Sequence, residues 1–193
     1  MTHRELFSDA RWPSPKGGAD AALCRATFTN NKAQSAEITI CGLGYFILYI
    51  NGQRVSTDEF APAYTDYHNR PDMVLSYPLN DTWSHRIHVM KYDISAFLRE
   101  GENVLGVMVG GGFYHQLLRK GEGDVSYGRI KLCYKIDFED GTTFVSDKNT
   151  KYQRGFFMSS NLFHGERHDY SRFDRSWNTE NAQSHGWATP DVV

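Results

Sequence analysis

The sequence predicts an all-β protein, a β-sandwich of jelly-roll type with one short helical turn. Apolar and β-branched runs recur along the chain with turn residues between them, which is typical of such folds. No segment keeps a helical period over a useful length. Aromatic residues make up 14% of the 193 residues. That content suits a sandwich core, and it also suits a protein that stacks on sugars.

Residues 45–50 (YFILYI) form the strand around which the other elements are best arranged, because every position is apolar or aromatic. Successive side chains of a strand point to opposite faces. A strand that is apolar on both faces is expected to lie centrally in its sheet. Residues 36–40 are expected to begin this strand. Asn51 and Gly52 then predict a two-residue hairpin turn into a return strand at residues 53–55.

Three further elements follow from local patterns. Residues 24–29 alternate and predict an edge or second strand. Residues 92–103 predict a short helical turn, with Asp93 or Ser95 as its cap, Phe97 and Leu98 buried and Gly101 at its end. Residues 104–109 are again apolar on both faces and therefore predict another central strand.

Residues 127–138 show the clearest alternation in the chain. Apolar side chains stand at positions 130, 132, 134, 136 and 138, and mostly polar ones stand between them. This pattern predicts a half-buried outer strand. Glu139, Asp140 and Gly141 predict a turn into a strand at residues 142–146.

The chain is divided into three parts by its turn and breaker residues. Residues 1–20 are expected to form a lead-in without regular structure, because prolines and Gly17-Gly18 interrupt it. Only Trp12 of this segment is expected to pack into the domain. Residues 21–175 are expected to form the sandwich. Residues 176–193 lack strong periodicity and are expected to be a linker or the start of a second sandwich, either frayed or packed onto the first.

Charge and composition exclude several classes of protein. The formal net charge is −2, and no basic block occurs, which argues against a nucleic-acid partner. No apolar run approaches the length that spans a membrane. The first residues lack the apolar stretch of a signal peptide, so a cytoplasmic location is favoured unless an export signal has been removed. Cys24, Cys41 and Cys133 are widely spaced and are expected to be free thiols in strands.

A family likeness is carried by four segments in order, which are LGYFILYINGQRV, FAPAYTDYHNR, YDISAFLREGENVLGVMVGGGFYHQ and HGERHDYSRFDRSWN. Together they resemble the N-terminal region of bacterial α-L-rhamnosidases, a glycoside hydrolase family, and the likeness runs from about residue 10 to residue 187. Strings such as YINGQRV also occur in galactose-binding-like sandwiches of other glycosidases, and the resemblance implies a sandwich of that type.

The resemblance implies a non-catalytic accessory domain ahead of a much larger enzyme. In that family the catalytic carboxylates lie in a helical barrel further along the chain, so no catalytic residue is carried over to this sequence. The implied partner is the catalytic domain of the same parent chain, which hydrolyses terminal α-L-rhamnosyl linkages. No cofactor and no metal are implied. The alternative is a freestanding carbohydrate-binding module.

The sequence departs from the family pattern in three places. An extra stretch covers about residues 78–90. Gly111 and Phe113 stand where the family tends to have an acidic residue and a tryptophan. Residues 150–152 stand where the family usually has a tryptophan. The second departure falls in a loop that is a candidate for sugar contact.

Two loops are the candidates for carbohydrate binding. Aromatic rings pack on the apolar C–H faces of sugars, while Asp, Asn and His side chains hydrogen-bond to hydroxyls. The loop at residues 61–68 also contains His68, and the loop at residues 110–116 follows a buried strand. If both loops act together, they should lie side by side at one end of the sandwich. The alternative is that their rings anchor the loops on the core. The candidate residues are Tyr64, Asp66, Tyr67, Phe113, Tyr114 and His115.

The segment at residues 164–168 has further possible roles. His164, Glu166 and His168 would share one face of a strand and could bind zinc, although Gly165 loosens the geometry. Glu166 and Asp169 could also form the acid and base of a glycosidase, but such pairs usually come from separate elements. The favoured interpretation is a polar loop or edge strand in which these two carboxylates pair with Arg167 and Arg172.

Overall fold

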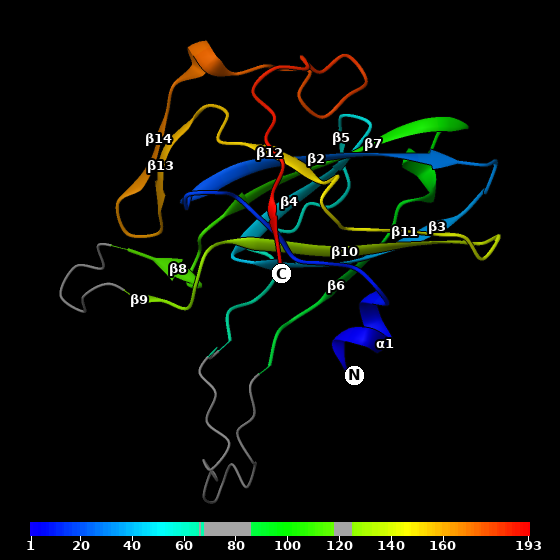
Figure 1. Cartoon of the computed structure of the whole chain (residues 1–193), viewed down its shortest axis with the longest axis horizontal. Coiled ribbons are helices and arrows are strands. Elements are labelled where there is room, and N and C mark those ends of the chain that lie inside the picture. The colour runs from blue at the N-terminus through cyan, green and yellow to red at the C-terminus, as the bar shows by residue number, and fades with distance from the viewer. Residues whose placement is uncertain (66, 68–85, 118–124) are drawn as a thin grey trace, which may run out of the picture.

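The computed structural model describes residues 1–65, 67, 86–117 and 125–193. These residues form two main antiparallel sheets, of five and four strands, packed face to face (Figure 1). The predicted all-β sandwich is therefore confirmed. Among the described residues, no helix is long and apolar enough to cross a membrane.

The strands follow a fixed order in each sheet. The five-stranded sheet runs β12 (Lys151–Gln153), β2 (Ala21–Asn30), β7 (Gly101–Gly110), β4 (Tyr45–Ile50) and β5 (Gln53–Arg54). The four-stranded sheet runs β11 (Thr143–Val145), β10 (Lys131–Phe138), β3 (Ala36–Leu43) and β6 (Met90–Asp93). Three pairs of short strands are β1 (Pro13–Ser14) with β15 (Asp191–Val192), β8 (His115–Gln116) with β9 (Val125–Ser126), and β13 (Phe157–Asn161) with β14 (Gly165–His168). The helical elements are α1 (His3–Phe7), η1 (Ser95–Phe97) and η2 (Tyr170–Arg172).

The core lies between the two sheets and is built by alternate residues of their strands. Burying apolar surface in this way is the main favourable contribution to folding. Leu105 of β7 and Ile136 of β10 are among the residues with no solvent exposure. The other buried side chains of this cluster from β2, β3, β4, β7 and β10 are Ala22, Cys24, Ala26, Phe28, Ala36, Ile38, Ile40, Phe46, Leu48, Ile50, Val107, Val109, Leu132, Tyr134 and Phe138.

Strand β7 is the central strand of its sheet, as the sequence predicts. It pairs with β2 over its whole length and with β4 along the other side. Strand β4 is also an inner strand, as predicted, because it lies between β7 and β5, although β5 has only two residues. At the other end of β4 the N–H of Phe46 donates to the carbonyl of Ala61, at 2.8 Å. The outward side chains of β4 are half-buried, so both of its apolar faces are covered.

The expectation that residues 36–40 begin the same strand as residues 45–50 is wrong. Residues 36–43 form β3, which belongs to the opposite sheet. Gly44 carries the chain across between the two sheets with φ of +123°. A Cβ at this position would lie 2.1 Å from the carbonyl oxygen of Gly110, so only glycine allows the backbones to approach this closely.

The hairpin predicted at residues 51–52 is confirmed. Asn51 and Gly52 have φ of 51° and 83°, as a two-residue turn of this kind requires. The buried Asn51 side chain donates to the carbonyl of Phe97 at 2.9 Å and accepts from the N–H of Val104, also at 2.9 Å. These hydrogen bonds attach the hairpin to η1 and to β7.

The predicted helical turn is confirmed as η1. The prediction that Asp93 or Ser95 caps it is wrong, because the N-cap residue is Ile94 and η1 has no side-chain cap. The carboxylate of Asp93 accepts from the N–H of Ser95 at 2.9 Å, a local turn hydrogen bond. Phe97 and Leu98 are half-buried and pack against the core. Gly101, with φ of 84°, stands at the start of β7.

Strand β10 keeps the predicted alternation, with Leu132, Tyr134 and Ile136 buried in the core. The prediction of an outer strand is wrong, because β10 lies between β3 and β11. Its second face is also covered, since Cys133 is fully buried in a cluster that includes Phe7 of α1.

The prediction that residues 1–20 lack regular structure is wrong. Residues 3–7 form α1, and the side chain of Thr2 and that of Glu5 cap it reciprocally. Strand β1 pairs with β15, so segments near the two ends of the described chain lie together. Trp12 packs at its predicted place, half-buried beside Phe7 with ring centroids 6.2 Å apart. The domain boundaries after residues 20 and 175 stay predictions.

The C-terminal segment packs against the outer face of the five-stranded sheet. Trp177 is only 2% exposed and belongs to a cluster with Leu23 and Phe157. Its ring meets that of Tyr49 edge-on, with centroids 5.7 Å apart. Gly106 of β7 provides the room, because a Cβ there would lie 2.6 Å from the Cβ of Asn178.

The cysteines are free thiols in strands, as predicted, and all three are buried. Cys24 lies in β2, Cys41 in β3 and Cys133 in β10. Burial in apolar surroundings raises the pKa of each thiol to about 12.

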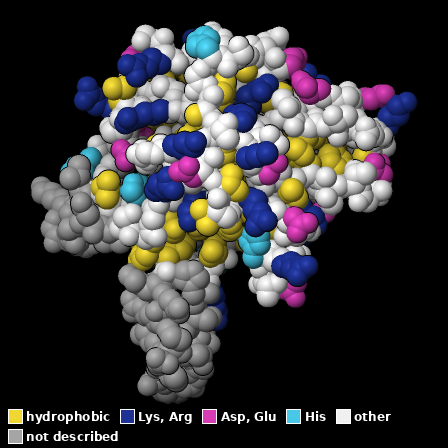
Figure 2. Space-filling model, viewed as in Figure 1, with side chains coloured by type: hydrophobic (Ala, Val, Ile, Leu, Met, Phe, Trp, Pro, Cys, Tyr) yellow, Lys and Arg dark blue, Asp and Glu magenta, His cyan; other side chains and the backbone are white. Residues whose placement is uncertain are grey.

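On the face shown in Figure 2, Lys and Arg side chains are interspersed with acidic and uncharged ones, in line with the small net charge of −2.

The close approach of Trp177 to β7 predicts a large difference between two glycine substitutions in that strand. Gly106→Ala should lower the free energy of unfolding by about 1–3 kcal/mol, because the added methyl group meets Asn178 and the Trp177 ring. Gly110→Ala is the matched control, since its Cβ would lie 3.6 Å from the Ser160 hydroxyl, an ordinary contact. Urea unfolding of both variants measures the difference. Equal stabilities would contradict the packing of the C-terminal segment on this sheet.

Candidate functional site

One end of the sandwich carries the loop that follows β7. Gly111 donates its N–H to the carbonyl of Asp20 at 2.7 Å, and the N–H of His115 donates back to the carbonyl of Gly111 at 3.0 Å. A Cβ at Gly111 would lie 2.5 Å from the carbonyl oxygen of His115. The loop is therefore a tight backbone turn, and this conformation has no room for the acidic side chain that the family tends to have at position 111.

The two predicted sugar-contact loops lie side by side. The rings of Tyr64 and Phe113 have centroids 4.9 Å apart, and those of Tyr67 and Tyr114 are 5.0 Å apart. Tyr64 and Tyr67 also contact each other edge-on at 5.8 Å. Phe163, from the β13–β14 connection, adds a further ring 6.4 Å from Phe113. We call Tyr64, Tyr67, Phe113, Tyr114 and Phe163 the aromatic loop cluster.

The rings of this cluster differ in exposure. Tyr64 is 48% exposed and Phe163 is 54% exposed, whereas Tyr114 is only 7% exposed and packs on the core cluster beneath α1. Tyr67 is half-buried, and burial is the main cause that raises the pKa of its phenol to about 12. Tyr64, Phe163 and the half-buried Phe113 therefore present ring surface to solvent, while Tyr67 and Tyr114 anchor the loops.

His115 lies at the edge of the cluster in β8. Its Nδ1 is 2.8 Å from the hydroxyl of Ser126, and its Nε2 is 4.0 Å from the carboxylate of Asp20. Its ring is half-buried. Asp66 and His68 of the other loop, and most of the extra stretch at residues 78–90, lie outside the described residues.

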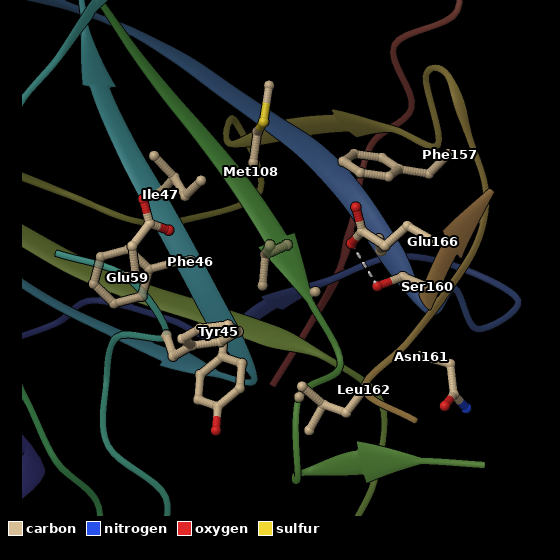
Figure 3. Close-up of a pocket in the computed structure, with 15 residues that line it drawn as sticks. Tyr45, Phe46, Ile47, Glu59, Met108, Phe157, Ser160, Asn161, Leu162 and Glu166 are labelled. Atoms are coloured by element: carbon tan, nitrogen blue, oxygen red, sulfur yellow. Dashed lines mark hydrogen bonds between the residues drawn. The ribbon is translucent and has the colours of Figure 1, made fainter. Parts of the chain in front are cut away.

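A pocket of about 380 Å³ opens beside the loops, on the outer face of the five-stranded sheet. Its floor is apolar and includes Ile47 of β4, Met108 of β7 and Phe157 of β13. Figure 3 shows Glu59 and Glu166 on opposite sides of this floor. The remaining lining residues with functional side chains are Tyr45, Phe60, Ser160 and Asn161.

Most residues of this pocket are absent from the predicted site. The outward face of β4 contributes Tyr45 and Ile47, and alternation along the strand places both on one face. Phe60 follows β5 and packs edge-on against Tyr45 with centroids 5.5 Å apart. The signal that could have identified them is a strand whose outward face is aromatic next to a loop with Glu59 and Phe60.

Glu166 is held by two neighbours. The hydroxyl of Ser160 donates to one carboxylate oxygen at 2.9 Å, and Nε2 of His168 lies 2.9 Å from the other. Figure 3 shows the first of these contacts as a dashed line. A second pocket, of about 390 Å³, lies next to the first and shares Glu166 and Ser160 with it. Glu59 is likewise paired, with Arg54 at 2.8 Å.

Residues 164–169 are candidates for a metal site and for a catalytic carboxylate pair, and their contacts bear on both possibilities. In the described part of the chain, no three His, Cys, Asp or Glu side chains are grouped as a metal site requires. Asp169 accepts from the N–H and the hydroxyl of Ser171 and lies 3.1 Å from Nε of Arg172. The hydrogen bond from the Ser171 hydroxyl is the main cause that lowers the pKa of Asp169. A carboxyl held in its ionised form is a poor general acid at neutral pH.

The favoured interpretation of this segment is partly confirmed. Asp169 pairs with Arg172, as predicted, and caps η2. Glu166 pairs with His168 and Ser160, and not with Arg167. The segment is therefore a strand with an exposed face, β14, followed by a capped turn.

The described residues thus define a β-sandwich domain with an aromatic loop cluster and an adjoining pocket at one end. The model of the family "Alpha-L-rhamnosidase N-terminal domain" matches residues 31–77 and 72–193 of the chain. The chain belongs to this family, as the resemblance of its sequence implies.

Relatives of known class agree with this assignment. An α-L-rhamnosidase of Formosa agariphila is 30% identical over 168 residues, which are 82% of this chain and 16% of the relative. One of Streptomyces avermitilis is 23% identical over 203 residues, 94% of this chain and 18% of the relative. The chain therefore spans less than a fifth of the length of these curated relatives.

Solved structures show the same fold. The α-L-rhamnosidase of Aspergillus terreus aligns with a TM-score of 0.81 and 24% identity, over 100% of this chain and 22% of that one. The enzyme of Dictyoglumus thermophilum aligns with a TM-score of 0.74 and 25% identity, over 96% of this chain and 21% of that enzyme. A lectin from Pleurotus ostreatus shares the fold at a TM-score of 0.56 and 15% identity, over 97% of this chain and 44% of the lectin.

Proposed function

We propose that the chain is an accessory domain of an α-L-rhamnosidase that hydrolyses terminal α-L-rhamnosyl linkages. The observation that carries this proposal is the family match together with its share of the relatives' length, 16% and 18% in two curated α-L-rhamnosidases. In this proposal the catalytic carboxylates come from another part of the parent chain.

The carboxylates of the candidate site support a non-catalytic role. An inverting or retaining glycosidase needs one carboxyl group that is protonated and one that is free to act as base or nucleophile. Glu59 is paired with Arg54, and Asp169 is paired with Arg172. Glu166 is hydrogen-bonded to Ser160 and His168. Each of these groups is used in local structure.

The proposed role of the loops is to contribute to substrate recognition while the domain packs on the catalytic part of the parent. Exposed rings of the aromatic loop cluster can cover the apolar face of a sugar, and the nearby carboxylates can accept hydrogen bonds from hydroxyl groups. The pocket next to the cluster, at about 380 Å³, is within the usual size range of small-molecule sites.

The enzymatic proposal predicts a clear division of activity. The full-length parent should release L-rhamnose from an aryl α-L-rhamnopyranoside, and the isolated chain of 193 residues should release none. The measurement is a chromogenic assay at equal molar concentrations of both proteins. Hydrolysis by the isolated chain, or a parent inactive on every α-L-rhamnoside tested, would contradict the proposal.

The second candidate function, a freestanding carbohydrate-binding module, is favoured by the 48% exposure of Tyr64 and the 54% exposure of Phe163. It predicts saturable amide NMR shifts around residues 61–65 and 111–116 when the chain is titrated with L-rhamnose and other sugars. Tyr64→Ala should abolish these shifts, because it removes an exposed ring of the cluster.

Tyr170→Ala is the matched control for this titration. Tyr170 is 68% exposed but packs on Phe156, with a ring separation of 5.6 Å, and it is not part of the aromatic loop cluster. The control should leave the shifts unchanged. If the unmodified chain shows no shifts at tens of millimolar sugar, the second candidate is rejected and the accessory role in the larger enzyme is retained.

A further inference from the structure

Two of the buried thiols face each other across neighbouring strands. Cys41 of β3 lies directly opposite Cys133 of β10 in the antiparallel ladder. Side chains at opposite positions point to the same face, with Cβ atoms about 4.5–5.5 Å apart. Both thiols are fully buried on the outer face of the four-stranded sheet, in one cluster with Phe7 and Ala10.

The hydrogen-bond pattern sets the geometry of this pair. The N–H of Glu139 donates to the carbonyl of Ser35, which belongs to the same register. Hydrogen-bonded pairs recur at every second position of an antiparallel ladder, so Cys133 and Cys41 form one of them. A second hydrogen bond supports this assignment. The N–H of Ser146 donates to the carbonyl of Tyr134, so the even-numbered residues of β10 bond toward β11 and the odd-numbered ones, including Cys133, bond toward β3.

A disulfide can close at this position, although under strain. Hydrogen-bonded pairs have Cα atoms about 5.5 Å apart, within the range of about 4.4–6.8 Å found for disulfides. Their Cβ atoms lie toward the wide end of about 4.5–5.5 Å, whereas a relaxed disulfide needs about 3.5–4.5 Å. Drawing the two strands together stores strain, and strain makes a disulfide easier to reduce.

We propose that Cys41 and Cys133 are a redox-active pair that closes reversibly into a strained cross-strand disulfide. A small-molecule disulfide such as oxidised glutathione supplies the oxidising equivalents. A bond forms between the two protein sulfur atoms, and the sulfur–sulfur bond of the reagent breaks. The two electrons and the two thiol protons of the cysteines pass to the reagent, which leaves as two thiols.

Access to the pair is controlled by α1. Phe7 of this helix packs in the same cluster as both thiols, and Nε2 of His3 lies 3.6 Å from the sulfur of Cys133. A helix of five residues has little stability of its own and depends on its packing. Local release of α1 can therefore expose the thiols while the sheets stay folded. Burial raises the pKa of both thiols to about 12, so few thiolates are present and oxidation is slow while α1 is in place.

Cys24 is an internal control, because it is also buried but lies opposite Val107 and Tyr152, neither of which is a cysteine. It belongs to the other sheet. If oxidation requires two thiols that face each other, Cys24 stays reduced. If oxidation instead requires unfolding of the chain, all three thiols become exposed and Cys24 is oxidised as well.

The test is oxidation of the full chain with oxidised glutathione, followed by alkylation in denaturant and intact mass spectrometry. The expected product has lost two hydrogen atoms, carries one alkyl group, and yields a peptide in which Cys41 is joined to Cys133. Cys24→Ser should still form the bridge and carry no alkyl group. Cys41→Ser and Cys41→Ala should each prevent the bridge, and the use of two substitutions separates loss of the partner thiol from loss of folding.

Three outcomes would overturn the proposal. The first is full alkylation of the oxidised chain, and the second is a bridge that includes Cys24. The third outcome is a bridge that persists when the oxidised protein is transferred to buffer with a large excess of reduced glutathione, because a strained disulfide should be reduced there. The proposal expects that buffer to restore the two thiols with the sandwich folded, as judged by an unchanged circular dichroism spectrum.

Discussion

The arrangement of the candidate site depends on the close packing of backbone at Gly44 against Gly110. A Cβ at Gly44 would lie 2.1 Å from the Gly110 carbonyl oxygen. This contact is where β3 crosses into β4 and where β7 runs into the loop at residues 111–116. Because Phe46 also bonds to the carbonyl of Ala61, the loop at residues 59–67 begins at the same place. Two loops far apart in sequence are thus held side by side by the sheets beneath them.

The outer faces of the sheets explain how segments near both ends of the described chain become part of the fold. Strands that are apolar on both faces leave a second surface to be covered. Helix α1 covers the four-stranded sheet around Cys133, and Trp177 covers the five-stranded sheet at Gly106. The sandwich is therefore closed by layers outside its main core, and α1 packs in the same cluster as the facing thiols.

Local structure was predictable from the sequence where a short motif strongly favours one backbone conformation. Asn51-Gly52 indicates its hairpin because both residues accept positive φ, and the alternation of β10 indicates its core face. The family resemblance and the proximity of the two aromatic loops were also predictable. The exposure of each ring was not, because tertiary packing decides that Tyr114 is buried while Tyr64 is exposed.

Other features could not be predicted because they depend on which elements become neighbours. The pattern of β3 and β4 records apolar faces and contains no information on the sheet to which each strand belongs. Helix α1 has too few residues for a periodic signal, and its stability comes from packing on β10. The pocket follows from the crossing at Gly44, since that crossing places Tyr45 beside Phe60.

The loops at residues 59–65 and 111–116, together with Tyr67, form one surface. The most direct measurement is a set of nuclear Overhauser contacts between aromatic rings of the folded chain. We expect contacts between Tyr64 and Phe113, whose ring centroids are 4.9 Å apart, as strong as those of the core pair Phe28 and Phe144 at 5.4 Å. Core contacts without any contact between Tyr64 and Phe113 would contradict it.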